Sequence, residues 1–242
     1  MVITCKYHGW TSARQFLNRM PSLEAWDLIS ASGLEPGRTF CSFRLRQLST
    51  PLHDCHAEVW RSLRTPYLAR LKLVAGDGTE LVLEELCSML LRSKSVLQEL
   101  LLIHISAHNA IYFISAHPSV MDLTVTSSYE EVSYEQFPGD LLPCLTISKD
   151  KNKPIFMPNL QSLNIVIHML SPYGDRWLLG RLARDVVKMV QSRANADSLP
   201  PGMPVLREFS LRLGLNDEVI FDHIRTSLAP LVTSRLQLWL ND

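Results

Sequence analysis

The chain has 242 residues, enough for one domain or for a run of stacked repeats that share a core. Apolar residues make up 46% of it and charged residues 20%, which excludes disorder over most of its length. Lys and Arg number 24, as do Asp and Glu, so no net charge recruits nucleic acid or an anionic membrane surface, and we expect neither as a partner.

Targeting and redox signals favour the cytoplasm or the nucleus. The longest apolar runs, such as Leu100–Ile103 and Ile111–Ile114, are too short to span a bilayer. Lys6 and His8 stand where the apolar core of a secretory signal would have to continue. The cysteines are odd in number and never form a CxxC pair, so we expect reduced thiols. They are Cys5, Cys41, Cys55, Cys87 and Cys144.

An apolar-x-x-apolar-x-apolar pattern recurs along the chain. Its second and third positions are two residues apart and predict strands with one face turned to a core. In chain order the copies are Leu23/Trp26/Leu28, Phe40/Phe43/Leu45, Leu68/Leu71/Leu73, Leu97/Leu100/Leu102, Val120/Leu123/Val125, Leu142/Leu145/Ile147, Leu160/Leu163/Ile165 and Leu206/Phe209/Leu211. Leu86/Met89/Leu91 has the same pattern but is predicted to be helical. The alternating Leu236, Leu238 and Leu240 predict a terminal edge strand or cap.

Proline precedes the first apolar position by two residues in five of the eight copies. At an ordinary proline usage of about 5%, fewer than one such coincidence is expected. Because proline cannot continue a helix and biases the residue before it toward extended geometry, each one marks the end of a connector and the start of a strand. These prolines are Pro21, Pro66, Pro118, Pro158 and Pro204.

Four connectors are predicted to be helices. They cover 11–20, 79–92, 175–193 and 216–228, with Thr11, Thr79, Asp175 and Asn216 as N-caps. In the third, the apolar face consists of Leu178, Leu182, Val186 and Met189. Its basic residues are expected on a solvated face, and they are Arg176, Arg181, Arg184, Lys188 and Arg193.

Five phrases of the chain carry a family resemblance. They are RSLRTPYLARLKLV (61–74), FISAHPSVMDLTV (113–125), FMPNLQSLNIVI (156–167), VVKMVQSR (186–193) and MPVLREFSLRL (203–213). They resemble the irregular leucine-rich repeat region of fungal F-box proteins. The resemblance implies a substrate-facing solenoid, which in that family follows an F-box docked on a Skp-type adaptor of a cullin ubiquitin ligase. No segment near Met1 has the features of an F-box, so we expect a Skp-type adaptor as a partner only if a longer form carries one.

The predicted fold class is α/β. We expect an irregular leucine-rich-repeat solenoid over 1–242, a single domain with parallel strands on one face and helices and loops on the other. Residues 126–157 are the candidate for an inserted loop that holds the degenerate strand Leu142/Leu145/Ile147. The asparagine ladder of regular repeats is missing, so we expect irregular curvature. Its positions hold residues that include Gly76, Ser128, His168 and Gly214.

Two histidine-containing segments are candidates for chemistry. In HISAHNAIYFISAH (104–117), the repeat pattern predicts His104 on a strand and His108 in the turn after it, with a short connector over 110–115, so we expect structural histidines and no metal. In His53-Asp54-Cys55-His56, a thiol stands beside two imidazoles. Because nucleophile and base usually meet from distant segments, a loop or helix start is favoured there.

The preferred function is protein binding without catalysis or a cofactor. Outward side chains of the predicted strands mix both charges with apolar Leu101 and Ile103, as in a protein-recognition surface. The predicted binding residues are Asp27, Arg70, Lys72, Glu99, Leu101, Asp122, Thr124, Asn164, Glu208, Ser210 and Arg212.

Two other interpretations stay open. One is a small hydrolase that uses Cys55 with His53 or His56, or a zinc ion bound by His104 and His108. The other is a truncated repeat protein with no activity of its own, for which poor solubility and exposed strand edges are expected.

Overall fold

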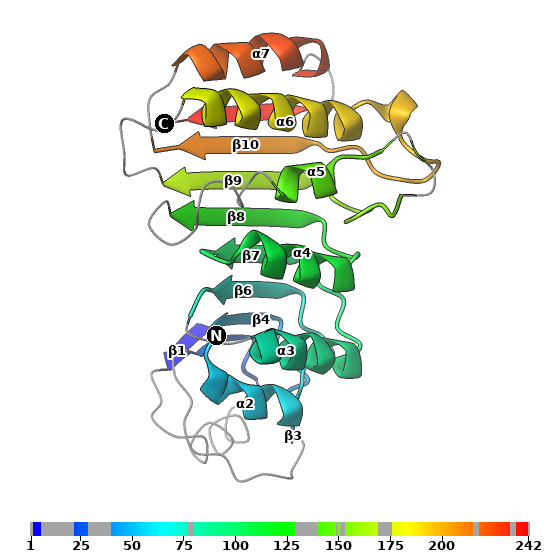
Figure 1. The fold of residues 1–242 in the computed structure, drawn as a ribbon. Helices are drawn as coiled ribbons and strands as arrows, with labels where there is room; N and C mark the ends of the chain where they lie inside the picture. The colour runs from blue at the N-terminus through cyan, green and yellow to red at the C-terminus, as the bar shows by residue number, and fades with distance from the viewer. Residues whose placement is uncertain are drawn as a thin grey trace. The chain divides into compact units, whose positions relative to one another are not determined.

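The protein folds into two compact units, residues 1–103 and 104–242. Figure 1 shows the helices and strands of each. The computed structural model describes residues 2–5, 22–28, 40–76, 80–128, 140–148, 150, 153–168, 176–214, 218–232 and 236–241. The predicted helix over 11–20 and the caps Thr79, Asp175 and Asn216 lie outside these residues, as does Pro21.

The first unit is an α/β structure whose main sheet is parallel. Its strand order, β1-β2-β4-β6-β7, follows the chain. These strands are β1 (Val2–Cys5), β2 (Ala25–Leu28), β4 (Gln47–Pro51), β6 (Arg70–Val74) and β7 (Glu99–Ile103). A separate pair joins β3 (Phe40–Cys41) to β5 (Leu63–Arg64). The helical elements are the 3-10 helix η1 (Asp54–His56), α2 (Ala57–Ser62) and α3 (Glu80–Ser93).

The second unit repeats this arrangement. Its parallel strands lie in the order β8-β9-β10-β11, again that of the chain. They are β8 (Asp122–Ser128), β9 (Ser162–His168), β10 (Glu208–Leu213) and β11 (Gln237–Asn241). The helical elements are α4 (Ala107–Ala116), α5 (Leu141–Leu145), α6 (Arg176–Ala194), the 3-10 helix η2 (Ala196–Ser198) and α7 (Glu218–Val232). The α/β class and the parallel strands are therefore confirmed, and β11 is the predicted terminal edge strand.

The proline signal is confirmed wherever the structure describes it. Pro66, Pro118, Pro158 and Pro204 each stand four residues before the first residue of a strand, and each of those strands pairs in parallel with a neighbour. The leucine or valine two residues after each proline is buried, so it packs beneath the start of the strand. Proline ends the connector here because its fixed φ cannot extend a helix.

Two predicted strands are wrong. Phe43 is 65% exposed, and the strand of that region is β4, whose buried positions are Leu48 and Thr50, preceded by the buried Leu45. Thr50 occupies the third inward position, where the repeat pattern expects an apolar residue, so the pattern did not predict this strand. The degenerate strand Leu142/Leu145/Ile147 is also wrong, because Leu141–Leu145 is the helix α5. A short apolar run fits a strand or a helix equally well, and in the folded chain this run packs as a helix. Residues 129–139 lie outside the described part.

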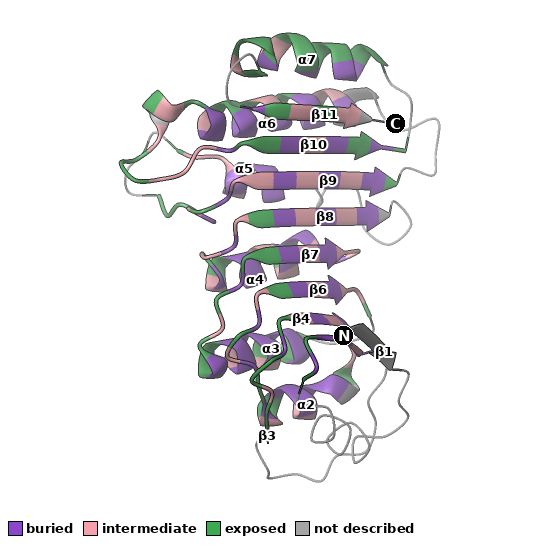
Figure 2. Ribbon diagram, turned by 180° about the vertical axis from the view of Figure 1, so that it is seen from behind, coloured by how far each residue is buried: buried purple, intermediate pink, exposed green. Residues whose placement is uncertain are grey.

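The core of each unit consists of rows of in-register side chains beneath the helices. In the first unit Trp26, Leu48, Leu71 and Leu100 are direct neighbours across four strands, and all four are almost fully buried. In the second unit the corresponding row is Leu123, Leu163, Phe209 and Leu238. Residues on either side of each row alternate with it in burial, as expected where one sheet face is packed and the other is not (Figure 2).

Helix α6 covers the core of the second unit with its predicted apolar face. Leu182, Val186 and Met189 are buried, while Arg181, Arg184 and Lys188 are exposed as predicted. Arg193 contradicts the prediction of a solvated basic face, since it is only 2% exposed. The side chains of Arg176 and Leu178 lie outside the described residues. No helix in the described ranges is both long and apolar enough to cross a membrane.

Candidate functional site

The outward strand face of the first unit presents charges of both signs together with a leucine. Asp27, Ser49, Lys72 and Leu101 form one in-register row across β2, β4, β6 and β7. In the row beside it, Arg70 pairs with Glu99 across β6 and β7. Neighbouring strands lie about 4.8 Å apart, so side chains of one row are close enough to contact one ligand surface. We call this set the first strand face.

The outward strand face of the second unit is more polar. One row crosses β8, β9 and β10 as Asp122, Ser162 and Glu208, and the Ser162 hydroxyl donates to the Glu208 carboxylate at 3.4 Å. The next row contains Thr124, Asn164, Ser210 and Trp239. The row after that contains Arg212 with Thr126, Val166 and Asn241. We call these three rows the second strand face.

The structure therefore places every predicted binding residue on the outward face of its own unit. All eleven are half-buried or exposed. Trp239 was missed, although the alternation of Leu236, Leu238 and Leu240 turns it outward, and its side chain is 56% exposed. An exposed tryptophan at the end of a polar row is the residue type most enriched at binding hot spots.

In each unit the described helices lie on one face of the sheet and leave the strand face open (Figures 1 and 2). This is unusual, because parallel sheets are nearly always covered on both faces. The open face carries half-buried apolar side chains, Val74, Leu101 and Ile103 in the first unit and Val166 in the second. Each face can therefore offer a rigid array of polar and apolar side chains to a ligand.

The segment His53-Asp54-Cys55-His56 is the start of a helix, as predicted. It forms the 3-10 helix η1, and His56 is fully buried with its Nδ1 atom 2.9 Å from the carbonyl oxygen of Pro51. Its ring also packs edge-on against Trp60, at 5.9 Å between centroids. His56 thus ties η1 to the end of β4. The side chain of Cys55 lies outside the described residues.

The pKa values of three described thiols are all raised above the ordinary value of a cysteine. Burial raises the pKa of Cys87 to about 12, helped by the charge of Glu84. Burial also raises the pKa values of Cys41 and Cys144. A nucleophilic cysteine needs the opposite shift, because the thiolate is the reactive form. These three free thiols are therefore held in their protonated form.

The predicted places of both His104 and His108 are wrong. His104 lies just after β7 and not on a strand, in the left-handed region with φ of 58°, and His108 lies in helix α4 and not in a turn. The connector is longer than predicted because Ser106 caps α4, accepting a hydrogen bond from the Asn109 amide. His104 lies outside that helix, so the two do not form a four-apart helical ligand pair. Over the described ranges, no group of three or more His, Cys, Asp or Glu residues is placed to hold a metal ion.

The buried His117 predicts that the second unit weakens as pH falls. It is 5% exposed and packs against Phe113 at 4.6 Å between ring centroids, and burial lowers its pKa to about 4 from 6.5. The unfolded chain takes up a proton near pH 6.5 and the folded chain only near pH 4, so stability is lost between these values, by about 3 kcal/mol. Urea denaturation at pH 7 and pH 4 measures the loss.

In His117→Leu this loss should be smaller by about the same 3 kcal/mol, because no imidazole remains to be protonated on unfolding. The control is His223→Leu, which changes an exposed histidine of α7 and should leave the pH profile as it is. If the free energy of unfolding falls by the same amount between pH 7 and pH 4 in the unchanged protein and in His117→Leu, this role of His117 is contradicted.

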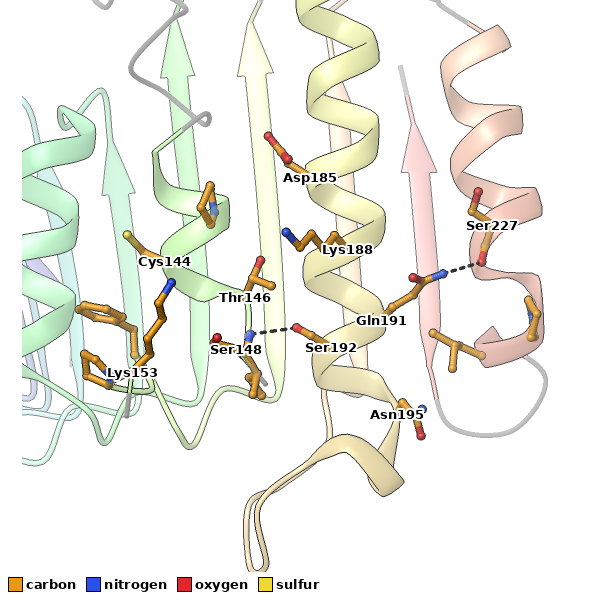
Figure 3. Close-up of a pocket in the computed structure, with 16 residues that line it drawn as sticks. Cys144, Thr146, Ser148, Lys153, Asp185, Lys188, Gln191, Ser192, Asn195 and Ser227 are labelled. Atoms are coloured by element: carbon orange, nitrogen blue, oxygen red, sulfur yellow. Dashed lines mark hydrogen bonds between the residues drawn. The ribbon is translucent and has the colours of Figure 1, made fainter. Parts of the chain in front are cut away.

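A hollow of about 1080 Å³ opens between α5, residues 146–148 and 153–156, α6 and α7 (Figure 3). Its apolar walls come from Pro143, Ile147, Pro154, Phe156, Pro230 and Leu231. Its polar lining includes Ser148, Lys153, Asp185, Lys188, Gln191 and Ser192. Two hydrogen bonds hold the walls together. The backbone amide of Ile147 donates to the Ser192 hydroxyl at 3.1 Å, and the side-chain amide of Gln191 donates to the Ser227 carbonyl at 3.3 Å.

Arg193 fixes one wall of the hollow. Its guanidinium donates to the carbonyl oxygens of Leu145, Phe156 and Met157, the last at 3.0 Å. Burial lowers the pKa of Arg193 to about 10, so it stays charged at neutral pH. Met157 has φ of 48°, a left-handed conformation that costs energy for a non-glycine residue. The arginine bonds hold this strained turn and the segment before it against α6.

No known protein family, curated protein or solved structure matches the chain.

Proposed function

We propose that the chain is a non-catalytic protein-recognition module that binds a protein partner through its strand faces. The observation that carries this proposal is the open face of each parallel sheet, free of helices among the described residues. On the first strand face, Lys72 is the in-register neighbour of Leu101, and Glu99 and Arg70 lie in the row beside them. Asp27 lies in the same row as Leu101, three strands away. Charged side chains beside an apolar one are typical of protein interfaces, where the charges select the partner and the apolar contact supplies affinity.

A leucine-rich-repeat architecture is part of the proposal. Within each unit the strand order equals the chain order, whereas doubly wound α/β folds reverse direction within the sheet. The described helices of a unit lie on the same side of its sheet (Figure 1). Both features support repeats that bury their apolar faces against their neighbours. They agree with the resemblance to the repeat region of fungal F-box proteins.

The same resemblance gives the proposal a biological form. In a longer form that carries an F-box, the chain would be the substrate-binding part of a ubiquitin ligase receptor, and the Skp-type adaptor would bind the F-box. Ubiquitin transfer would then be performed by other subunits. The role of this chain would be to select the substrate protein.

Charge reversal on the first strand face tests the proposal. The double variant Arg70→Glu/Lys72→Glu should reduce the capture of partner proteins from native cells by about tenfold or more, because like charges across an interface repel the partner. Both side chains point away from the core, so the melting temperature should change little. Quantitative mass spectrometry of affinity-purified samples measures the capture.

The matched control is Arg44→Glu/Arg184→Glu. It changes the net charge by the same amount at two exposed positions that are not part of either strand face. This variant should capture the same proteins as the unchanged chain. If Arg70→Glu/Lys72→Glu behaves like the control, the first strand face is not the recognition surface.

A further inference from the structure

The hollow of the second unit is lined by two lysines that pair with no carboxylate of the described residues. No ion pair among the described residues includes Lys153 or Lys188. Asp185 is the one carboxylate among the lining residues, and it already pairs with Arg181 at 3.7 Å. The lining therefore carries an excess of positive charge although the chain as a whole is neutral.

The two lysines reach the hollow from opposite walls. In Figure 3, Lys153 extends upward from the segment below α5, and Lys188 extends from α6 toward Thr146. Two of the lining hydroxyls donate within the protein: Thr146 donates to the Leu142 carbonyl at 2.8 Å and Ser192 to the Met189 carbonyl at 2.7 Å. The ammonium groups are the charged donors that the lining offers to a ligand.

The hollow also has apolar walls. Ile147, Phe156 and Leu231 are half-buried, so each leaves part of its side chain open to the hollow. The volume, about 1080 Å³, is close to the upper end of the range for sites that bind drug-sized molecules. Such sites combine apolar walls with a few polar groups that orient the ligand.

We propose that this hollow binds a small amphipathic anion, an apolar body that carries a carboxylate or phosphate group. The apolar body packs against Phe156, Ile147 and Leu231, and the anionic group lies between Lys153 and Lys188. The inference is independent of the proposed strand-face function, because it concerns a different set of residues on a different side of the second unit's sheet.

The test uses dodecanoate and dodecyl phosphate as probes, below their micelle concentrations, in isothermal titration with the full chain. One molar equivalent of at least one probe should bind, and the preferred probe identifies the anionic group. Dodecanol, which has the same apolar body without charge, should bind at least about tenfold more weakly, since charge-assisted hydrogen bonds are lost. Equal binding of dodecanol would overturn the role of the lysines.

The variant Lys153→Gln/Lys188→Gln should weaken binding of the preferred probe by about tenfold or more. The control Arg44→Gln/Lys94→Gln removes the same charge at exposed positions outside the hollow and outside both strand faces, and should leave the affinity unchanged. Leu231→Gln should weaken the anions and dodecanol alike, because it changes only the apolar wall. Unchanged affinity in Lys153→Gln/Lys188→Gln, or no binding of either anion to the unchanged chain, would overturn the proposal.

Discussion

Replacing Arg193 with methionine should lower the free energy of unfolding of the second unit by about 3–5 kcal/mol. The methionine fills much of the same buried space, but it leaves the carbonyl oxygens of Leu145, Phe156 and Met157 without their common donor. Each unsatisfied buried acceptor costs about 1–3 kcal/mol. At the strained turn the Met157 oxygen keeps its bond from the Leu160 amide and loses the one from Arg193. Urea denaturation followed by circular dichroism measures the change.

Two variants separate the hydrogen bonds of Arg193 from its charge. Arg193→Lys keeps the charge but lacks the planar fork that reaches three carbonyls, so it should restore only part of the stability. Arg184→Met removes an exposed arginine from the same helix and should change the free energy by less than about 0.5 kcal/mol. Equal stabilities for Arg193→Met and Arg184→Met would show that the buried bonds contribute little.

A methyl group at Gly76 should destabilise the first unit by about 2–4 kcal/mol. Gly76 follows β6, and a Cβ atom there would lie 2.2 Å from the carbonyl oxygen of Leu52 and 3.0 Å from the ring of His53. The first contact is with backbone, so the chain after β4 or β6 has to move, and overpacking of this kind costs energy. The denaturation midpoint of Gly76→Ala measures the effect.

Gly180→Ala is the opposite case in the same protein. It lies within helix α6, and a Cβ atom there meets nothing within 4 Å. Alanine should stabilise the second unit by about 0.5–1 kcal/mol, because glycine loses more backbone entropy in a helix. If both alanine variants shift the midpoint in the same direction, the close approach at Gly76 is not the cause.

Much of the fold could be predicted from local chemistry. The prolines before β6, β8, β9 and β10 mark the starts of strands because a fixed φ and a missing amide hydrogen act within one or two residues. The alternating apolar pair Leu71/Leu73, like the same pair in the other strands, identifies the buried face. It does so because strand side chains alternate by backbone geometry alone. Neither signal depends on distant parts of the chain.

The two wrong strand predictions arose where the same residue type fits two different local structures. Thr50 is buried beside leucines, and its polar side chain concealed the strand β4. Leu142 and Leu145 fit a strand pattern but lie in the helix α5, which packs on α6. A six-residue apolar pattern carries no information on its packing partner, so only the folded chain distinguishes these cases.

The candidate sites divide in the same way. The eleven outward residues and, by the same alternation, Trp239 follow from strand periodicity, so the sequence by itself determined which side chains the strand faces present. The burial of Arg193 and the hollow lined by Lys153 and Lys188 were decided only by tertiary structure. Arg193 lies 48 positions from Leu145 and 36 from Met157. Contacts over such separations depend on where whole helices and loops pack, which a local pattern does not encode.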